Sequence, residues 1–171
     1  MLGLKPNYKL FICQVEKMDK LYDVDFQLWV KKTIDSLENR DFETLDIDRL
    51  IEELTELGKS EQKALASNLM ILLAHLLKIT VQFEAPEMMK NSWYNSIDEH
   101  RQRVLFDLQE TPSLKSYLKI AIEKAYPNAR KLAIKEGKLA KYGVRVPNES
   151  EYSVICPFSI EEILDEEFYG S

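Results

Sequence analysis

The stretch from Asp46 to Phe83 is the part of the sequence that most constrains how this chain can fold. It reads DIDRLIEELTELGKSEQKALASNLMILLAHLLKITVQF and is almost wholly of helical pattern. We expect two helices in it, the first capped by Asp46 and the second running from about Ser60 to Phe83. Gly58, followed closely by Ser60, predicts a break, a kink or a C-cap and N-cap pair between them. The apolar face of the first helix consists of Ile47, Leu50, Ile51, Leu54 and Leu57.

Helical patterns also cover the rest of the chain. Pro127 either kinks one of these helices or begins another that continues through Lys138. Ser159 and Glu162, three residues apart, form a capping box for a short last helix. No run of residues alternates convincingly enough for a buried strand, so we expect an all-α, up-and-down helical bundle of about five to seven helices. The other expected helix starts are Asp23 and Ser92 as N-caps and Thr111-Pro112-Ser113 as a first turn.

The length and the start of the sequence suggest how the chain is divided. A chain of 171 residues can form one domain with a substantial core. Residues 1–18 are interpreted as a leader, either disordered or the product of a start placed too early, since Met18 opens a natural beginning. Residues 19–171 are then expected to form a single helical domain.

Charge and cysteine content exclude several classes of protein. The net charge of −6 argues against nucleic acid as a partner, because such proteins need a basic surface. Cys13 and Cys156 are far apart and lack metal-ligand spacing, which favours a reducing, cytoplasmic setting. The longest apolar run, Leu69 to Leu77, contains His75 and is too short to cross a bilayer, so we expect no membrane association.

A line of polar residues runs along the leucine-rich second half of the Asp46–Phe83 stretch. Its members are seven residues apart, which displaces each by only about 20° around an ideal helix. The line is either a buried network, the wall of a groove or the solvent-facing edge of the helix. Lys78 lies beside it. The line consists of Glu61, Asn68, His75 and Gln82.

Arg101 falls in the middle of an apolar helical face formed by residues such as Trp93, Ile97 and Val104. An unpaired buried charge is costly, so the guanidinium must reach water or find an acceptor. We expect Glu53 or Asp25 as its partner. The pair is interpreted either as a structural ion pair that fixes helix register or as part of a functional site.

Other acidic residues and the two histidines were considered as metal ligands. Glu52 and Glu56 point away from the apolar face of their helix, towards solvent or, if that side is covered, towards His75 or Arg101. The ExxH pairs of di-iron bundles and the HExxH motif are absent, and the chain has only two histidines. We therefore expect no metal and no cofactor. The common phosphate-binding, dinucleotide-binding and serine-hydrolase motifs are absent too.

Seven segments together carry a resemblance to a known family. They are, in order, YDVDFQLW, LDIDRLIEELTELGKSE, LLAHLLK, SWYNSIDEHR, TPSL, AYPNAR and CPFSIEEILDEEF. They resemble the bacterial family known as domain of unknown function 29, which is abundant in cyanobacteria. The resemblance covers roughly Leu21 to Phe168 and implies a small, all-helical, up-and-down bundle-like domain with no established activity.

The chain departs from the family pattern at Gln82-Phe83, where the family has Gln-Pro, and in its leader. The positions at which the family pattern matches this chain are Asp25, Trp29, Glu52, Glu53, Glu56, Gly58, His75, Lys78, Trp93, Arg101, Tyr126 and Arg130.

Three functions are compatible with these patterns. The first is a non-catalytic interaction or regulatory module that binds a basic protein partner through acids such as Glu52, Glu56 and the run 165–167. The second is a hydrolase or nuclease-like enzyme with a groove between helices, in which Glu53 or His75 is the base and Lys78 and Arg101 stabilise negative charge. The third is a structural role for the polar network, with function elsewhere on the surface. The candidates for binding are Asp25, Glu52, Glu56, Tyr126 and Arg130.

Overall fold

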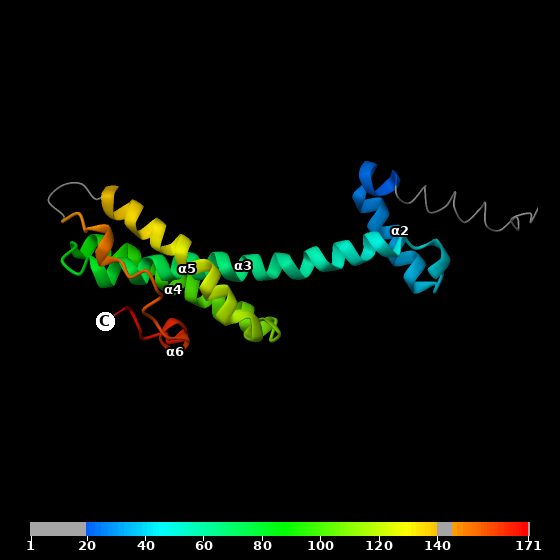
Figure 1. The fold of residues 1–171 in the computed structure, drawn as a ribbon. Coiled ribbons are helices and arrows are strands. Elements are labelled where there is room, and N and C mark those ends of the chain that lie inside the picture. Colours follow the sequence, from blue (N-terminus) through cyan, green and yellow to red (C-terminus); the bar gives the residue numbers. More distant parts are fainter. Residues whose placement is uncertain (1–19, 140–144, 171) are drawn as a thin grey trace, which may run out of the picture. The chain divides into compact units, whose positions relative to one another are not determined.

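The computed structural model describes residues 20–139 and 145–170, and the described residues contain helices but no strand (Figure 1). This confirms the predicted all-α fold. The leader predicted at residues 1–18 lies outside the described residues. The main helices are α2 (Phe26–Glu38), α3 (Ile47–Val81), α4 (Glu87–Glu110), α5 (Leu114–Leu139) and α6 (Ile160–Leu164), with 3-10 turns η1 (Phe42–Thr44) and η2 (Glu149–Glu151).

The chain divides into two compact units, Met1–Gly58 and Lys59–Ser171. Unit 1 contains α2, η1 and the beginning of α3. Unit 2 contains the remainder of α3 together with α4, α5 and the C-terminal segment, by which we mean residues 145–170.

In unit 1, α2 begins later than its sequence pattern predicted. Asp25 and not Asp23 is the N-cap, and its carboxylate accepts a hydrogen bond from the Leu28 amide at 3.0 Å. Asp23 lies in a preceding helical turn, which is why it cannot cap the helix. Trp29 is buried, and its ring packs edge-on against Tyr22 and stacks on Phe26. This aromatic cluster anchors α2.

The predicted break at Gly58 is wrong, because α3 continues through it as one helix. Asp46 caps the start as predicted, accepting from the Arg49 amide at 3.0 Å. A glycine that ends a helix usually adopts a positive φ, and Gly58 does not. A single glycine inside a helix costs only about 1 kcal/mol, which is too little to end it.

The core of unit 2 is built from the second half of α3 and the inner faces of α4 and α5. The loops between these three helices are short, residues 82–86 and 111–113, as in an up-and-down arrangement, and Figure 1 shows α4 and α5 beside the C-terminal half of α3. The leucines in the second half of α3 are buried. The fully buried side chains include Leu65, Leu69, Leu72, Leu73 and Leu76 from α3, and Ile97 and Val104 from α4.

In unit 2 the start of α4 differs from the sequence prediction, and the structure decides between the two alternatives at Pro127. Pro86, not Ser92, is the N-cap of α4, because proline suits a helix start where the backbone N–H would have no partner. Ser92 lies inside α4, and its hydroxyl donates to the Met89 carbonyl at 2.8 Å. Pro127 lies inside α5, so no further helix begins there.

The C-terminal segment runs from residue 145 along unit 2 to α6 and beyond. Ser159 and Glu162 form the predicted capping box at the start of α6. A second capping box joins Asn148 and Glu151 at η2. With only these short helices, the segment leaves many carbonyl groups without main-chain partners, and side chains of the other helices accordingly supply donors to it.

One helix of the described residues, α3, is long and apolar enough to cross a membrane by length and composition. Half of its most apolar stretch is buried within the protein.

Candidate functional site

The polar line of α3 lies against α4. The Asn68 side-chain amide nitrogen donates to Asp107 in a long contact of 3.5 Å, and the Nδ1 atom of His100 lies 3.1 Å from the Asn68 side-chain oxygen Oδ1. At the end of the line, Gln82 is buried and its amide donates to the Tyr152 hydroxyl at 3.1 Å. The line therefore consists largely of contacts between elements, with only Glu61 fully exposed.

His75, in the middle of this line, is half-buried. Its Nδ1 atom lies 3.0 Å from the Ile71 carbonyl and 3.3 Å from the Ser96 hydroxyl. Because a carbonyl only accepts, Nδ1 carries a proton in this arrangement. Burial lowers the pKa of His75, and the nearby Lys78 charge acts in the same direction. The ring is therefore neutral at pH 7 and is held by its neighbours.

Lys78 is a buried cation with two partners. Its ammonium lies 2.5 Å from Glu136 of α5 and 4.5 Å from the centroid of the Trp93 ring of α4. Only 5% of the residue is exposed. The carboxylate and the aromatic face together compensate the lost hydration. Lys78 thus joins three helices, and its charge is already neutralised.

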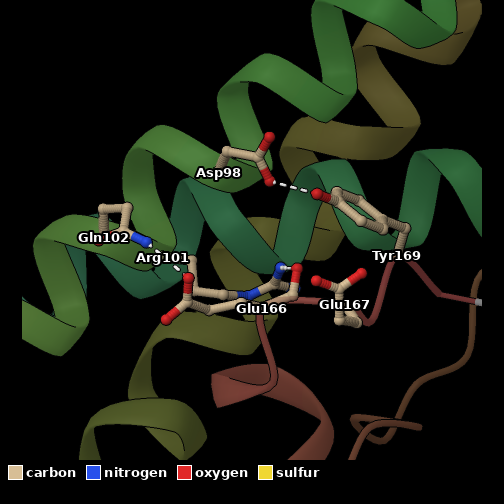
Figure 2. Close-up of a pocket in the computed structure, with 6 residues that line it drawn as sticks. All are labelled: Asp98, Arg101, Gln102, Glu166, Glu167 and Tyr169. Atoms are coloured by element: carbon tan, nitrogen blue, oxygen red, sulfur yellow. Dashed lines mark hydrogen bonds between the residues drawn. The ribbon is translucent and has the colours of Figure 1, made fainter.

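Arg101 lies in an apolar helical face and is buried, with 1% of its surface exposed, so of the two alternatives its guanidinium finds acceptors and does not reach water. The expected partners, Glu53 and Asp25, were wrong. The guanidinium instead donates to three carbonyl groups that have no helical partner, at the end of α6 and after it. Figure 2 shows Arg101 beside Glu166, one of the three acceptor residues. The acceptors are Ile163 at 3.1 Å, Glu166 at 3.3 Å and Phe168.

Tyr126 and Arg130 of α5 bind the C-terminal segment in the same way. The Tyr126 hydroxyl donates to the Ser153 carbonyl at 2.7 Å. Arg130 donates to the carbonyls of Tyr152 and Glu149 at 3.1 and 3.0 Å. Three of the residues that the sequence singled out therefore hold the main chain of one segment. The sequence analysis considered only side chains as partners, and it therefore did not predict that these residues bind main-chain carbonyls.

A polar pocket of about 300 Å³ lies where α4 meets the end of the C-terminal segment (Figure 2). The Tyr169 hydroxyl donates to Asp98 at 2.7 Å, and Gln102 donates to Glu166 at 3.0 Å. The hydrogen bond to Asp98 raises the pKa of Tyr169. Sequence reasoning missed this pocket because Asp98 and Tyr169 are distant in the chain. Its lining consists of Asp98, Arg101, Gln102, Glu166, Glu167 and Tyr169.

The remaining candidates lie in unit 1. Asp25 caps α2, and Glu53 accepts a hydrogen bond from the Tyr22 hydroxyl. Glu52 is exposed and pairs with Arg49 at 3.0 Å. Glu56 is exposed on the same helix. Asp25, Glu52 and Glu53 thus have partners within unit 1. Glu52 and Glu56 are exposed to solvent.

The four candidates for catalysis lie in separate environments. Glu53 belongs to unit 1, whereas His75, Lys78 and Arg101 belong to unit 2. Within unit 2, His75 contacts α4, Lys78 pairs with α5 and Arg101 binds the C-terminal segment. Within the described ranges, no three His, Cys, Asp or Glu side chains converge as metal ligands would.

Unit 1 has an unexpected surface. The apolar faces predicted for a bundle core in this part of the chain are largely exposed. Buried side chains in the described part of unit 1 are only Trp29, Thr33 and Leu45. Periodicity had revealed the apolar faces but could not show what covers them. The exposed large apolar residues there are Val24, Phe26, Leu28, Ile34, Leu37, Phe42, Ile47, Ile51, Leu54 and Leu57.

Comparison with known proteins gives one match. The model of a family described as Domain of unknown function DUF29 matches residues 21–169. No curated protein matches the chain, and neither does any solved structure.

Proposed function

We propose that the chain, which belongs to the DUF29 family, is a non-catalytic interaction module that binds a protein partner through unit 1. The observation that carries this proposal is the distribution of exposed apolar residues. Of the 17 large apolar residues that are exposed in the described part of the chain, ten lie between residues 24 and 57. Apolar surface gathered in this way marks a place where another molecule binds.

The small core of unit 1 supports the same proposal. Only Trp29, Thr33 and Leu45 are buried among its described residues. A segment of about 40 residues with so few buried side chains gains little from the hydrophobic effect. Covering its apolar surface with a partner would supply the missing burial, at about 25 cal/mol for each Å² removed from water.

The charge of unit 1 indicates the kind of protein that would bind. Residues 20–58 contain eleven Asp and Glu against five Lys and Arg, a net charge of −6 that equals the net charge of the whole chain. The rest of the chain is therefore balanced. A partner with a basic surface would complement unit 1 and associate with it faster at low salt.

The enzyme alternative receives less support from the contacts. A hydrolase or nuclease built on Glu53, His75, Lys78 and Arg101 needs these groups to meet one substrate. Lys78 and Arg101 are instead buried with their charges compensated, by Glu136 and by three carbonyls. Their contacts favour the structural role for this network, with function on another surface.

The test is affinity capture from cell extract with the full chain and with a double variant, Ile51→Asp/Leu54→Asp. Both side chains are more than half exposed, so the variant should fold normally, which circular dichroism would check. We expect at least one protein to be captured by the native chain and lost with the variant. Phe106→Asp, an equally exposed apolar position on α4, is the matched control and should retain it. Identical capture by native chain and double variant would overturn the proposal.

A further inference from the structure

We propose that the partner segment is a basic amphipathic helix that lies along the first turns of α3. This inference rests on the proposed function and names the chemistry of the partner. The binding surface is a stripe of four apolar residues, Ile47, Ile51, Leu54 and Leu57, which are 47%, 56%, 59% and 62% exposed.

The spacing of the stripe indicates a helical partner. Its residues are four, three and three positions apart, which places them within about one third of the circumference of the helix. At 1.5 Å per residue they span roughly 15 Å along α3. A narrow apolar line of this length matches the apolar face of another helix, which presents anchors at intervals of three and four residues.

The charges beside the stripe select a basic partner. Asp48, Glu52 and Glu56 follow at four-residue intervals on the neighbouring face, and all three are exposed. Glu52 pairs with Arg49 in an exposed contact of the kind that contributes little to stability. A lysine or arginine of the partner could therefore replace Arg49 at small cost, and carboxylates at these intervals fit cations that repeat along a helix.

The same row of carboxylates disfavours two other occupants. In a symmetric antiparallel pair of two copies the row would lie against itself, and like charges would repel. An anionic lipid surface would be repelled as well. The apolar spacing and the acidic row together therefore favour a separate basic helix.

The test is fluorescence anisotropy with the full chain and two labelled peptides of about 20 residues, both carrying leucine at the apolar heptad positions. One peptide has lysine at the flanking positions, and its matched control has glutamate there. We expect the lysine peptide to bind at least about tenfold more tightly, and its affinity to fall as salt rises from about 50 to about 300 mM. Leu54→Asp should weaken it about tenfold or more, while Phe106→Asp should leave it unchanged. Glu52→Lys/Glu56→Lys should reverse the preference between the peptides.

Several outcomes would overturn this inference without affecting the proposed function. Equal binding of the two peptides would exclude charge selection. If neither peptide bound, but a captured protein were still lost with Ile51→Asp/Leu54→Asp, the partner would not be a basic helix. A dimer in sedimentation that Leu54→Asp dissociates would identify a second copy as the occupant. If a chain that starts at Met18 bound the lysine peptide at least about tenfold more tightly than the full chain does, the residues before Met18 would be identified as a competing occupant of the stripe.

Discussion

Replacement of Arg101 by methionine should weaken the attachment of the C-terminal segment to α4. Arg101→Met keeps most of the side-chain volume but removes every donor, so the effect reports the hydrogen bonds more than a cavity. The guanidinium donates to three carbonyls between Ile163 and Phe168. We expect the free energy of unfolding to fall by about 2–5 kcal/mol.

This magnitude follows from the three acceptors. The bond to the Ile163 carbonyl is buried, so leaving that carbonyl unpaired should cost about 2–3 kcal/mol. The bonds to Glu166 and Phe168 are only partly buried, and water can replace the lost donor there, so each should contribute about 1 kcal/mol or less. Methionine avoids the cost of burying a charge, which keeps the total near the lower end.

Urea unfolding followed by circular dichroism would measure the loss, and limited proteolysis would show whether residues 159–170 become accessible. Arg103→Met is the matched control, since Arg103 is 57% exposed and pairs with Glu99 on the surface, and it should cost less than about 0.5 kcal/mol. In a chain that lacks residues 159–171, the acceptors are gone, and Arg101→Met should cost less than about 1 kcal/mol. A loss below about 0.5 kcal/mol in the full chain, or the same large loss in the shortened chain, would refute the assigned role of Arg101.

Three further predictions concern His75 and two glycines. Burial lowers the pKa of His75 in the folded chain, whereas in the unfolded chain a histidine has a pKa of about 6.5. Below about pH 6.5 the unfolded chain therefore binds more protons than the folded chain, and the free energy of unfolding should fall as the pH drops through this value. His75→Gln should reduce that slope in urea unfolding between about pH 5 and pH 7.5, and an unchanged slope would contradict the assignment. Gly137→Ala should cost about 1–3 kcal/mol in the same assay, since the new Cβ would lie 2.7 Å from the Tyr152 hydroxyl and displace it from Gln82; a neutral result would show that Tyr152 can move freely. Gly58→Ala should instead stabilise the protein by about 0.5–1 kcal/mol, because alanine favours a helix more than glycine does and nothing lies within 4 Å of the new methyl group. A lower melting temperature in the variant would contradict this.

The candidate residues of unit 2 show how far sequence reasoning reached. The helical phase of α4 placed Arg101 in an apolar face and left open whether its guanidinium reaches water or finds an acceptor; the residue is buried. It could not identify the acceptors, which are main-chain carbonyls more than 60 residues away. Carbonyls occur at every residue and leave no signal in the side-chain pattern. The search for a carboxylate partner therefore pointed to Glu53 and Asp25, which have other contacts.

The sequence by itself determined the features that depend on neighbouring residues. These are the helices, the caps at Asp46 and Ser159 and the polar line of α3, because hydrogen bonds and periodicity within a few turns produce them. Only the tertiary structure decided which apolar faces are covered. The leucines after Leu65 are buried by α4 and α5, whereas Ile51 and Leu54 on the same helix are exposed, although both groups have the same helical pattern. Burial depends on what packs against a face, and that is settled by contacts between residues distant in the chain.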